Sequence, residues 1–349
     1  MKLLQNLQHK SIKEWMGFLQ KPLILIGLMV VLTIIQPGVF LTGSNFMSIF
    51  LAISIYGVMV CGTIFPILLG GIDLSVGAVA AMSGACVVLT VIHFGYSTTG
   101  VILGVLLGLA SGMIAGLVHG VLVAKFNVPA FLITLASQNI IYGIAQLLTG
   151  NQVINCLKPA SFTFIGGGRL LGIPFSIYIL TVVALICYFI LNHTTFGRKI
   201  YAVGGNDVSS DLSGISSKKV KVAAYVISGF TAALAGIVLA SMNQQAIAKA
   251  AAGYENDVLT AIVVGGTSLM GGEGSLQGAM FGALLVGMLS NGLRLMGVPS
   301  TYHSVVKGIV IIAAVAIDAY SRYRRSGLQR NSKLFGKKTC SPVQDKKKK

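Results

Sequence analysis

Neutral hydrogen-bonding side chains interrupt otherwise apolar stretches of this chain. In one stretch they are Thr134, Gln138, Asn139 and Gln146, and another stretch ends in Asn243, Gln244 and Gln245. Residues four apart share a helix face, so Gln138 would lie beside Thr134. Such amides and hydroxyls can line a route for a neutral, hydroxyl-rich solute, and each of them can instead hydrogen-bond to a neighbouring helix. Asp73 and Ser75, at the start of a further apolar run, complete this candidate path, although a carboxylate there can also cap a helix.

Catalytic and metal-binding patterns do not occur in the sequence. The five histidines are scattered, with neither HExxH nor paired-cysteine spacing, so no metal site and no cysteine nucleophile is indicated. The stretch Gly336-Lys337-Lys338-Thr339 resembles part of a nucleotide phosphate loop, but position 331 is Asn where that loop requires glycine. We therefore expect no enzyme activity, no bound cofactor and no metal in this chain.

The composition sets the solvent in which these side chains must act. Of 349 residues, 54% are hydrophobic and only 10% are charged, against about 25% charged in a soluble domain. The mean hydropathy is +0.83. These values exclude a soluble enzyme, a nucleic-acid-binding module and a disordered scaffold, and they indicate many membrane spans.

The net charge of +17 is unevenly distributed along the chain. Eleven of the 26 Lys and Arg residues follow Tyr320, and four precede the first apolar run. This distribution indicates membrane topology and attraction to anionic lipid, at roughly 1 kcal/mol per residue near the surface, rather than nucleic-acid binding.

Ten segments are long and apolar enough to be membrane-spanning helices, which need about 20 residues. They are residues 23–40, 46–69, 72–94, 100–123, 130–148, 173–191, 223–242, 254–270, 276–296 and 302–320. The eighth is short and is interrupted by Gly265 and Gly266, so we expect a broken or re-entrant helix there. The sequence thus predicts an all-α polytopic membrane protein with an amphipathic segment (1–21), a transmembrane domain (22–321) and a basic tail (322–349).

Lys and Arg in the short loops predict the orientation of these spans. They concentrate in the segments that share a side with the N-terminus, so both termini and the loop 192–222 are expected in the cytoplasm. Lys307 follows the start of the last span by five residues and is expected to extend its ammonium group outward to the membrane surface.

Two glycine patterns indicate how the helices are arranged. The stretch 70–77 matches 265–272 as G-G-x-x-L-x-x-G, which predicts a parallel internal repeat of the kind found in transporters, although glycine pairs can also match by chance. Glycines also recur every four residues at Gly104, Gly108, Gly112, Gly116 and Gly120. Such a ladder is typical of closely packed membrane helices.

The loop 192–222 contains a short amphipathic helix pattern. Asn206 is a good N-cap, Val208, Leu212 and Ile215 recur on one face, and Gly214 can end the helix. A helix of about two turns is unstable alone and needs a partner surface. That surface can belong to another protein or to this protein's own helices.

Four motifs in order carry a resemblance to a known family. They are Gly70 to Gly77; Phe196-Gly197-Arg198 with Ala202 to Asn206 and Ser213-Gly214-Ile215; Gly265 to Leu269 with Gly271 to Gly274; and Asn291-Gly292-Leu293 with Lys307-Gly308 and Asp318. Over most of residues 20–321 the chain resembles the permease subunits of bacterial ABC importers for monosaccharides such as ribose, xylose, arabinose and galactose.

The resemblance implies that the short helix is a coupling helix, formed by Gly204, Gly205, Asn206, Val208, Leu212, Gly214 and Ile215, which docks on a separate ATPase subunit carrying ATP and Mg²⁺. It further implies a second permease chain, a periplasmic or lipoprotein sugar-binding protein, and a place in the bacterial inner membrane. Two departures from the family pattern stand out. Ser209 and Ser210 replace two alanines, and Asn256 replaces a leucine between Glu255 and Asp257, at the expected outer mouth.

Two other functions remain open at this point. An importer of this kind can carry a nucleoside or a sugar-like signalling molecule instead of a monosaccharide. A secondary transporter working alone would need a proton or Na⁺ gradient and no docking helix. The spans contain few charged residues, which does not favour ion coupling.

Overall fold

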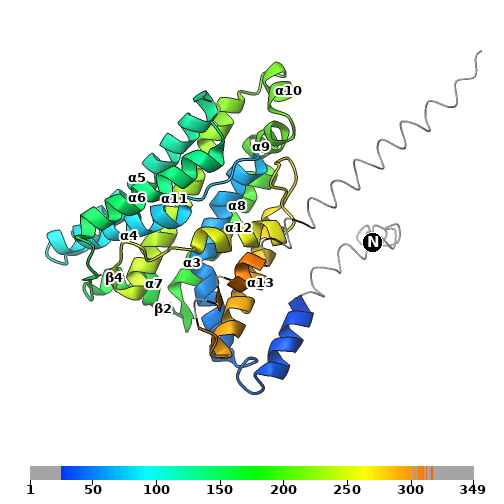
Figure 1. Ribbon diagram of the computed structural model, residues 1–349. Helices are drawn as coiled ribbons and strands as arrows, with labels where there is room; N and C mark the ends of the chain where they lie inside the picture. The colour runs from blue at the N-terminus through cyan, green and yellow to red at the C-terminus, as the bar shows by residue number, and fades with distance from the viewer. Residues whose placement is uncertain are drawn as a thin grey trace, which may run out of the picture.

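The computed structural model describes residues 25–126 and 128–299, together with 302, 303, 305–309, 312 and 316. Its elements, in order after the helix Leu25–Ile35, are α3 (Gly43–Leu68), α4 (Val76–His93), α5 (Thr98–Phe126), α6 (Ala130–Thr149), β1 (Ile154–Asn155), α7 (Ala160–Gly167), β2 (Arg169–Leu170), β3 (Ile173–Pro174), α8 (Phe175–His193), α9 (Thr195–Gly205), α10 (Asp207–Leu212), α11 (Ser217–Asn243), β4 (Gln245–Ala246), α12 (Tyr254–Val264) and α13 (Leu276–Leu295). Figure 1 shows a helical bundle with α9 and α10 at one end and the short strands toward the other. The strands pair antiparallel, β1 with β4 and β2 with β3.

Seven of the described helices are long and apolar enough to cross a membrane: α3, α4, α5, α6, α8, α11 and α13. They correspond to seven of the ten predicted spans, so the all-α polytopic fold is confirmed. The first predicted span contains the shorter helix Leu25–Ile35. The last one, the amphipathic segment 1–21 and the tail 322–349 lie mostly or wholly outside the described residues.

The eighth predicted span is broken, as its glycines suggested. Helix α12 has 11 residues and ends at Val264. At 1.5 Å per residue it extends only about 16 Å, which is too short to cross the hydrocarbon layer. A loop containing several left-handed glycines, among them Gly266 (φ +90°) and Gly271 (φ +84°), follows it and leads to α13.

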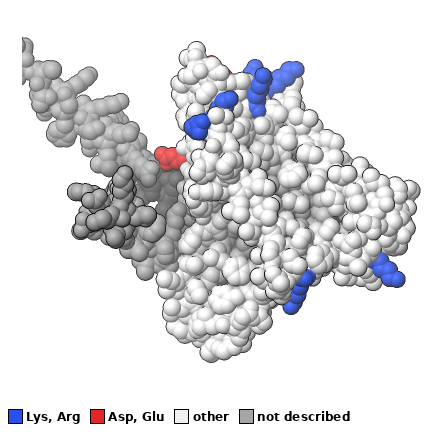
Figure 2. Space-filling model, turned by 180° about the vertical axis from the view of Figure 1, so that it is seen from behind, with Lys and Arg blue, Asp and Glu red and all other residues white. Residues whose placement is uncertain are grey.

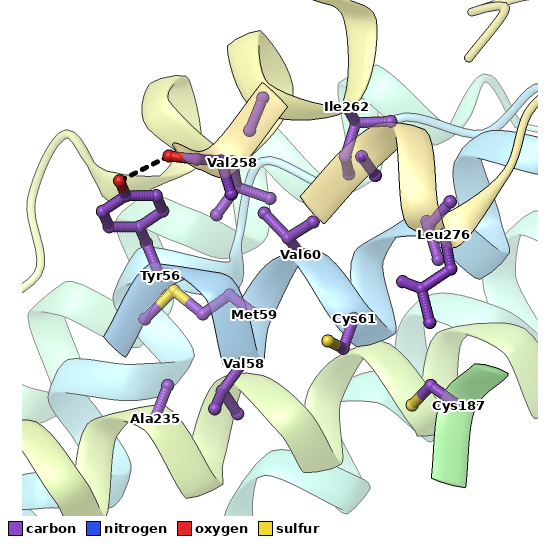
Figure 3. Packing of buried hydrophobic residues seen from close by; sticks show 14 of the residues in the cluster. Tyr56, Val58, Met59, Val60, Cys61, Cys187, Ala235, Val258, Ile262 and Leu276 are labelled. Atoms are coloured by element: carbon purple, nitrogen blue, oxygen red, sulfur yellow. Dashed lines mark hydrogen bonds between the residues drawn. The ribbon is translucent and has the colours of Figure 1, made fainter. Parts of the chain in front are cut away.

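Helix α3 lies at the centre of the main apolar core. Its residues Val58, Met59 and Cys61 are fully buried, and α3 packs against α8, α11, α12 and α13. Figure 3 shows the α3 side chains facing Ala235 of α11 and Val258 of α12. By contrast, few residues of α6 and α8 are buried, which is expected of helices at the outside of a bundle in lipid.

The glycine ladder of α5 is a packing surface, as predicted. A Cβ atom at Gly104 or Gly108 would meet α4 at Val87 or Ser83, and the three later glycines of the ladder lie against the backbone of α11. Without Cβ atoms the helices approach closely enough for extensive van der Waals contact.

The two copies of the glycine motif share one feature and differ in another. Each follows the end of a helix, α3 or α12. The next helix begins six residues after Gly70 in the first copy, at Val76, but 11 residues after Gly265 in the second, at Leu276. The internal repeat therefore stays a prediction.

Candidate coupling surface and translocation path

Helices α9 and α10 lie at one end of the bundle, and a side-chain cap begins each of them. The Thr194 hydroxyl accepts a hydrogen bond from the Gly197 N–H and begins α9. The Asn206 side chain accepts from the Ser209 N–H across 2.9 Å and begins α10. Gly214, in the left-handed region at φ +81°, follows the end of α10. The N-cap and the helix predicted from the sequence are therefore present.

The outward face of α10 is apolar. The side chains of Val208 and Leu212 are 66% and 87% exposed. Ile215, which the spacing placed on the same stripe, instead packs partly against the main core, because Gly214 turns the chain back toward the bundle before it. The exposed pair is thus smaller than the sequence suggested, and no described residue covers it.

The two serines of α10 fit their positions. Ser210 is 5% exposed, and its hydroxyl donates to the Asn206 carbonyl across 2.8 Å. The backbone N–H of Ser209 donates to the Asn206 side chain that caps α10. The departure from alanine at these positions is therefore compatible with the helix.

Two carboxylates hold α10 against the first turn of α11. Lys221 donates to Asp207 across 2.9 Å, and this hydrogen-bonded ion pair lowers the pKa of Asp207. Asp211 accepts from both the N–H and the hydroxyl of Ser217, each at 2.8 Å. These hydrogen bonds lower the pKa of Asp211.

A glycine-lined junction connects α9 with α3. A Cβ atom at Gly204 would overlap the carbonyl oxygen of Leu68, the last residue of α3. The same oxygen accepts from the Gly272 N–H at 2.8 Å. Beside this junction lies a groove of about 510 Å³, bordered by Gly204, Asn206, Val208, Lys221 and Met270 among others. Met270 is 75% exposed, so it adds a third apolar side chain to this end of the molecule.

The same end is rich in basic side chains. Figure 2 shows Lys and Arg gathered at the end of the molecule where α9 and α10 lie in Figure 1. The exposed residues here are Lys125, Arg198, Lys199, Lys218 and Lys219.

Asp73 and Ser75 lie in a buried polar cluster. Ser75 donates to Asp73 through its N–H and, at 2.6 Å, through its hydroxyl. Ser228 of α11 donates to the second carboxylate oxygen of Asp73 at 2.8 Å. His119 of α5 contacts Ser75 and also Ser137 of α6. The cluster joins four elements, and a role for Asp73 and Ser75 in the path stays a prediction.

The other predicted path residues fall into separate groups. Thr134 is fully buried and donates to the carbonyls of Ile72 and Ala130. Asn139 is exposed on α6. Asn243 and Gln244 lie at the far end of α11, where the Gln244 carbonyl accepts from the Cys156 N–H at 2.7 Å. Gln138 and Asn139 therefore lie on different sides of α6, and Asn243 and Gln244 lie apart from both.

Gln138 has a partner that the sequence did not indicate. Its side-chain amide donates to Glu255, at the start of α12, across 2.9 Å. Asn256, between Glu255 and Asp257, is exposed, and its place at the outer mouth stays a prediction. Lys307 does not extend outward but pairs with Asp257 at 2.8 Å, where the aspartate side chain is 8% exposed.

Glu255, Asp257, His119 and Met270 are therefore candidate functional residues that sequence reasoning missed. A usable signal existed for the two acids, since polar residues inside a membrane segment are costly and commonly functional. Met270 carried no such signal, because an apolar residue in an apolar segment is unremarkable until its exposure is known.

Comparison with known proteins identifies the family of the chain. A family described as the permease component of a branched-chain amino acid transport system matches residues 45–315. The chain is 39% identical over 299 residues to the ribose import permease protein of Haemophilus influenzae, which covers 85% of this chain and 91% of that protein. It is 41% identical over 294 residues to the ribose import permease protein of Bacillus subtilis, with 83% and 89% covered. An L-arabinose transport system permease protein of Escherichia coli is 35% identical over 284 residues, with 81% and 85% covered.

No solved structure matches the chain. The relatives confirm the family resemblance that the four sequence motifs indicated. The family match spans most of the chain, from α3 to beyond α13. This protein therefore belongs to that family of transport-system permease components.

Proposed function

We propose that this chain is the membrane-spanning permease subunit of an ATP-driven importer for a monosaccharide. The names of relatives 35–41% identical over more than four fifths of the chain support a pentose such as ribose or arabinose as the cargo. The observation that carries the proposal is the exposed apolar pair Val208 and Leu212 on a capped helix outside the bundle. Apolar side chains that are exposed to water on a helix indicate a surface that a partner protein covers.

The partner in this proposal is a separate ATPase subunit, which would bind ATP and Mg²⁺ itself. Its closure would move α10, and the contacts of α10 would pass that movement into the bundle. Asp207 and Asp211 would transmit it to α11, and Gly204 to the end of α3. Because these contacts are short and polar or closely packed, α10 would move with the helices rather than alone.

The proposed orientation places α9 and α10 in the cytoplasm of a bacterium, with the chain in its inner membrane. The gathering of Lys and Arg at that end supports this orientation. A sugar-binding protein would then deliver cargo to the opposite end, and a second permease chain would complete the transporter.

Membrane lipid is a further proposed partner at the basic end. An apolar groove of about 860 Å³ lies between α5 and α11, and Lys125, Lys218 and Lys219 border it. Three cations beside an apolar groove suit the phosphate and acyl chains of an anionic phospholipid.

The coupling assignment can be tested with charge substitutions on the exposed pair. We expect Val208→Asp and Leu212→Asp each to abolish copurification with the ATPase and ATP-dependent uptake of labelled ribose, while membrane insertion is retained. Leu171→Asp is the matched control. Leu171 is 91% exposed and lies in the turn before α8, at the end of that helix opposite to α9. Normal ATPase binding and uptake by the α10 variants would overturn the proposal.

The secondary-transporter alternative has one observation in its favour, the interior ion pair of Asp257 and Lys307. Both charges of that pair are already satisfied by each other, which leaves little capacity for a coupling ion. Reconstitution of the chain alone decides between the two functions, because uphill transport without an ATPase would support the secondary transporter. Competition of ribose uptake by nucleosides would support the cargo alternative.

A further inference from the structure

A partly exposed carboxylate lies deep inside the helical bundle. Gln138 lies eight residues after the start of the 20-residue helix α6, which places it about 12 Å along a helix of about 30 Å. Glu255 accepts a hydrogen bond from Gln138 and therefore lies at nearly the same depth. Glu255 is only half-buried at this depth.

Within the described part of the chain, no Lys or Arg forms an ion pair with Glu255. Among the described residues the ion pairs are Asp207 with Lys221 and Asp257 with Lys307, and neither includes Glu255. A Cβ atom at Gly77 of α4 would overlap its carboxylate, so the glycine allows the close approach. The backbone N–H of Gly253 and the Gln138 amide are its hydrogen-bond donors.

Tyr142 places an unused hydroxyl beside this carboxylate. A Cβ atom at Gly77 would lie 3.1 Å from the Tyr142 oxygen as well as against Glu255, so the two groups adjoin. Tyr142 is 9% exposed, and by distance and angle its hydroxyl makes no hydrogen bond in the described part of the chain, although the Gln138 side chain lies close enough to interact with it. A buried hydroxyl without a partner costs about 1–3 kcal/mol, so one without a structural role indicates a ligand or water.

The polar side chains continue along one side of α6. Asn139, Tyr142 and Gln146 follow at spacings of three and four residues and share a face, and Asn139 is exposed. The neighbouring flank is apolar: Ile140 is 63%, Ile144 41% and Leu147 83% exposed, at spacings of four and three residues. Leu132 and Leu135 precede Asn139 on its own face, so the polar face of α6 is confined to the part of the helix from Gln138 to Gln146.

We propose that the polar face of α6, together with Glu255 and Tyr142, lines the aqueous route and hydrogen-bonds the hydroxyl groups of the cargo. A charged side chain at the bilayer centre costs about 2.5–3.5 kcal/mol on insertion scales, so a partly exposed carboxylate there faces water or protein rather than lipid. This assignment rests on the proposed import function. The carboxylate accepts and the phenol both donates and accepts, which matches a neutral polyhydroxylated solute.

Water access to this face can be measured without knowing the cargo. The five cysteines are replaced by alanine, and single cysteines are introduced as Asn139→Cys, as Asn256→Cys at the exposed residue that follows Glu255 in α12, and as the depth-matched control Ile140→Cys. We expect a charged, membrane-impermeant methanethiosulfonate to modify the first two and to leave the third unmodified, because the reaction needs a hydrated thiolate. Equal labelling of all three, or formation of intersubunit disulfides at Asn139→Cys in place of labelling, overturns the proposal.

Cargo recognition is tested in the complete importer with labelled ribose. Loss of a hydrogen bond to a charged group corresponds to about a tenfold effect or more, so we expect Glu255→Gln and Tyr142→Phe to lower the maximal uptake rate by about that factor. ATPase binding should be unchanged in both variants. Unchanged uptake by both variants overturns the proposal. Water access at Asn139→Cys without any ribose uptake by the unmodified importer would retain the route and reject the cargo of the proposed function.

Discussion

The backbone N–H of Gly272 donates to the carbonyl of Leu68 across 2.8 Å, and this hydrogen bond joins the loop after α12 to the end of α3. Gly204 of α9 lies against the same carbonyl oxygen. Three segments that are distant in the chain thus meet at one atom. In the proposed coupling, a movement of α9 would act on α3 and on the α12–α13 loop through this junction.

The junction predicts unequal effects for two adjacent glycines. In Gly204→Ala the new methyl group would overlap the Leu68 carbonyl. A methyl group at position 205 would meet no other atom within 4 Å, so Gly205→Ala serves as the control. Overpacking of this kind costs about 1–3 kcal/mol. We expect Gly204→Ala to lower the apparent melting temperature of the purified protein and to reduce ATP-dependent uptake, with Gly205→Ala close to the unmodified protein. Equal behaviour of the two variants would show that the contact is not needed.

Met270 is predicted to contribute to the same docking surface as α10. It is 75% exposed and borders the groove that also includes Val208. Truncation of an apolar contact at an interface costs about 1 kcal/mol, so we expect Met270→Ala to weaken ATPase binding about fivefold. Binding of the purified ATPase to the permease in nanodiscs measures this affinity. In a double-mutant cycle with Val208→Ala, strictly additive losses would mean that the two side chains contact the ATPase independently.

Local features of the fold could be predicted because each depends on a short stretch of chain. A run of about 20 apolar residues is sufficient to form each long helix, and the side chain of Asn206 is sufficient to begin α10. The glycine ladder of α5 predicted close packing, though not that α4 and α11 would be its partners. These predictions needed no knowledge of which segments meet.

The depth of Glu255 could not be predicted for the opposite reason. Hydropathy treats residues 254–270 as one segment that starts at the membrane surface, but α12 begins inside the bundle beside Gly77 and Gln138. Only the path of the preceding loop determines this depth. The exposure of Met270 likewise depends on how its loop folds against Leu68.

The position of α10 is predicted to depend on the ionisation of Asp211. Its hydrogen bonds to Ser217 lower its pKa in the folded protein, so they stabilise α10 fully above the ordinary carboxyl pKa of about 3.9. This stabilisation is lost as the pH falls through the lowered value. An environment-sensitive dye on Ser213→Cys, in the cysteine-free background, should report a transition below about pH 3.9.

The variant Asp211→Ala should show a smaller acid transition, because only the Asp207–Lys221 pair then holds α10 against α11. It should also be cleaved faster by trypsin at Lys218 and Lys219, which follow Ser217 in the first turn of α11. Ser209→Ala is the control, since the cap uses the N–H of Ser209 and not its hydroxyl. An identical acid transition in Asp211→Ala and the unmodified protein would assign the transition to another group.

The interior ion pair predicts that single substitutions are more damaging than the double one. Lys307 and Asp257 are 2.8 Å apart, with 21% and 8% of their side chains exposed. Removing one partner leaves an uncompensated buried charge, which typically costs about 3–5 kcal/mol, whereas replacing both by apolar residues is often neutral. We therefore expect Lys307→Met and Asp257→Leu each to lower the apparent melting temperature, and the double variant to recover most of the loss. Lys249→Met, at an exposed lysine outside any pair of the described residues, is the control. Additive losses in the double variant would mean that the two charges stabilise the protein through other groups.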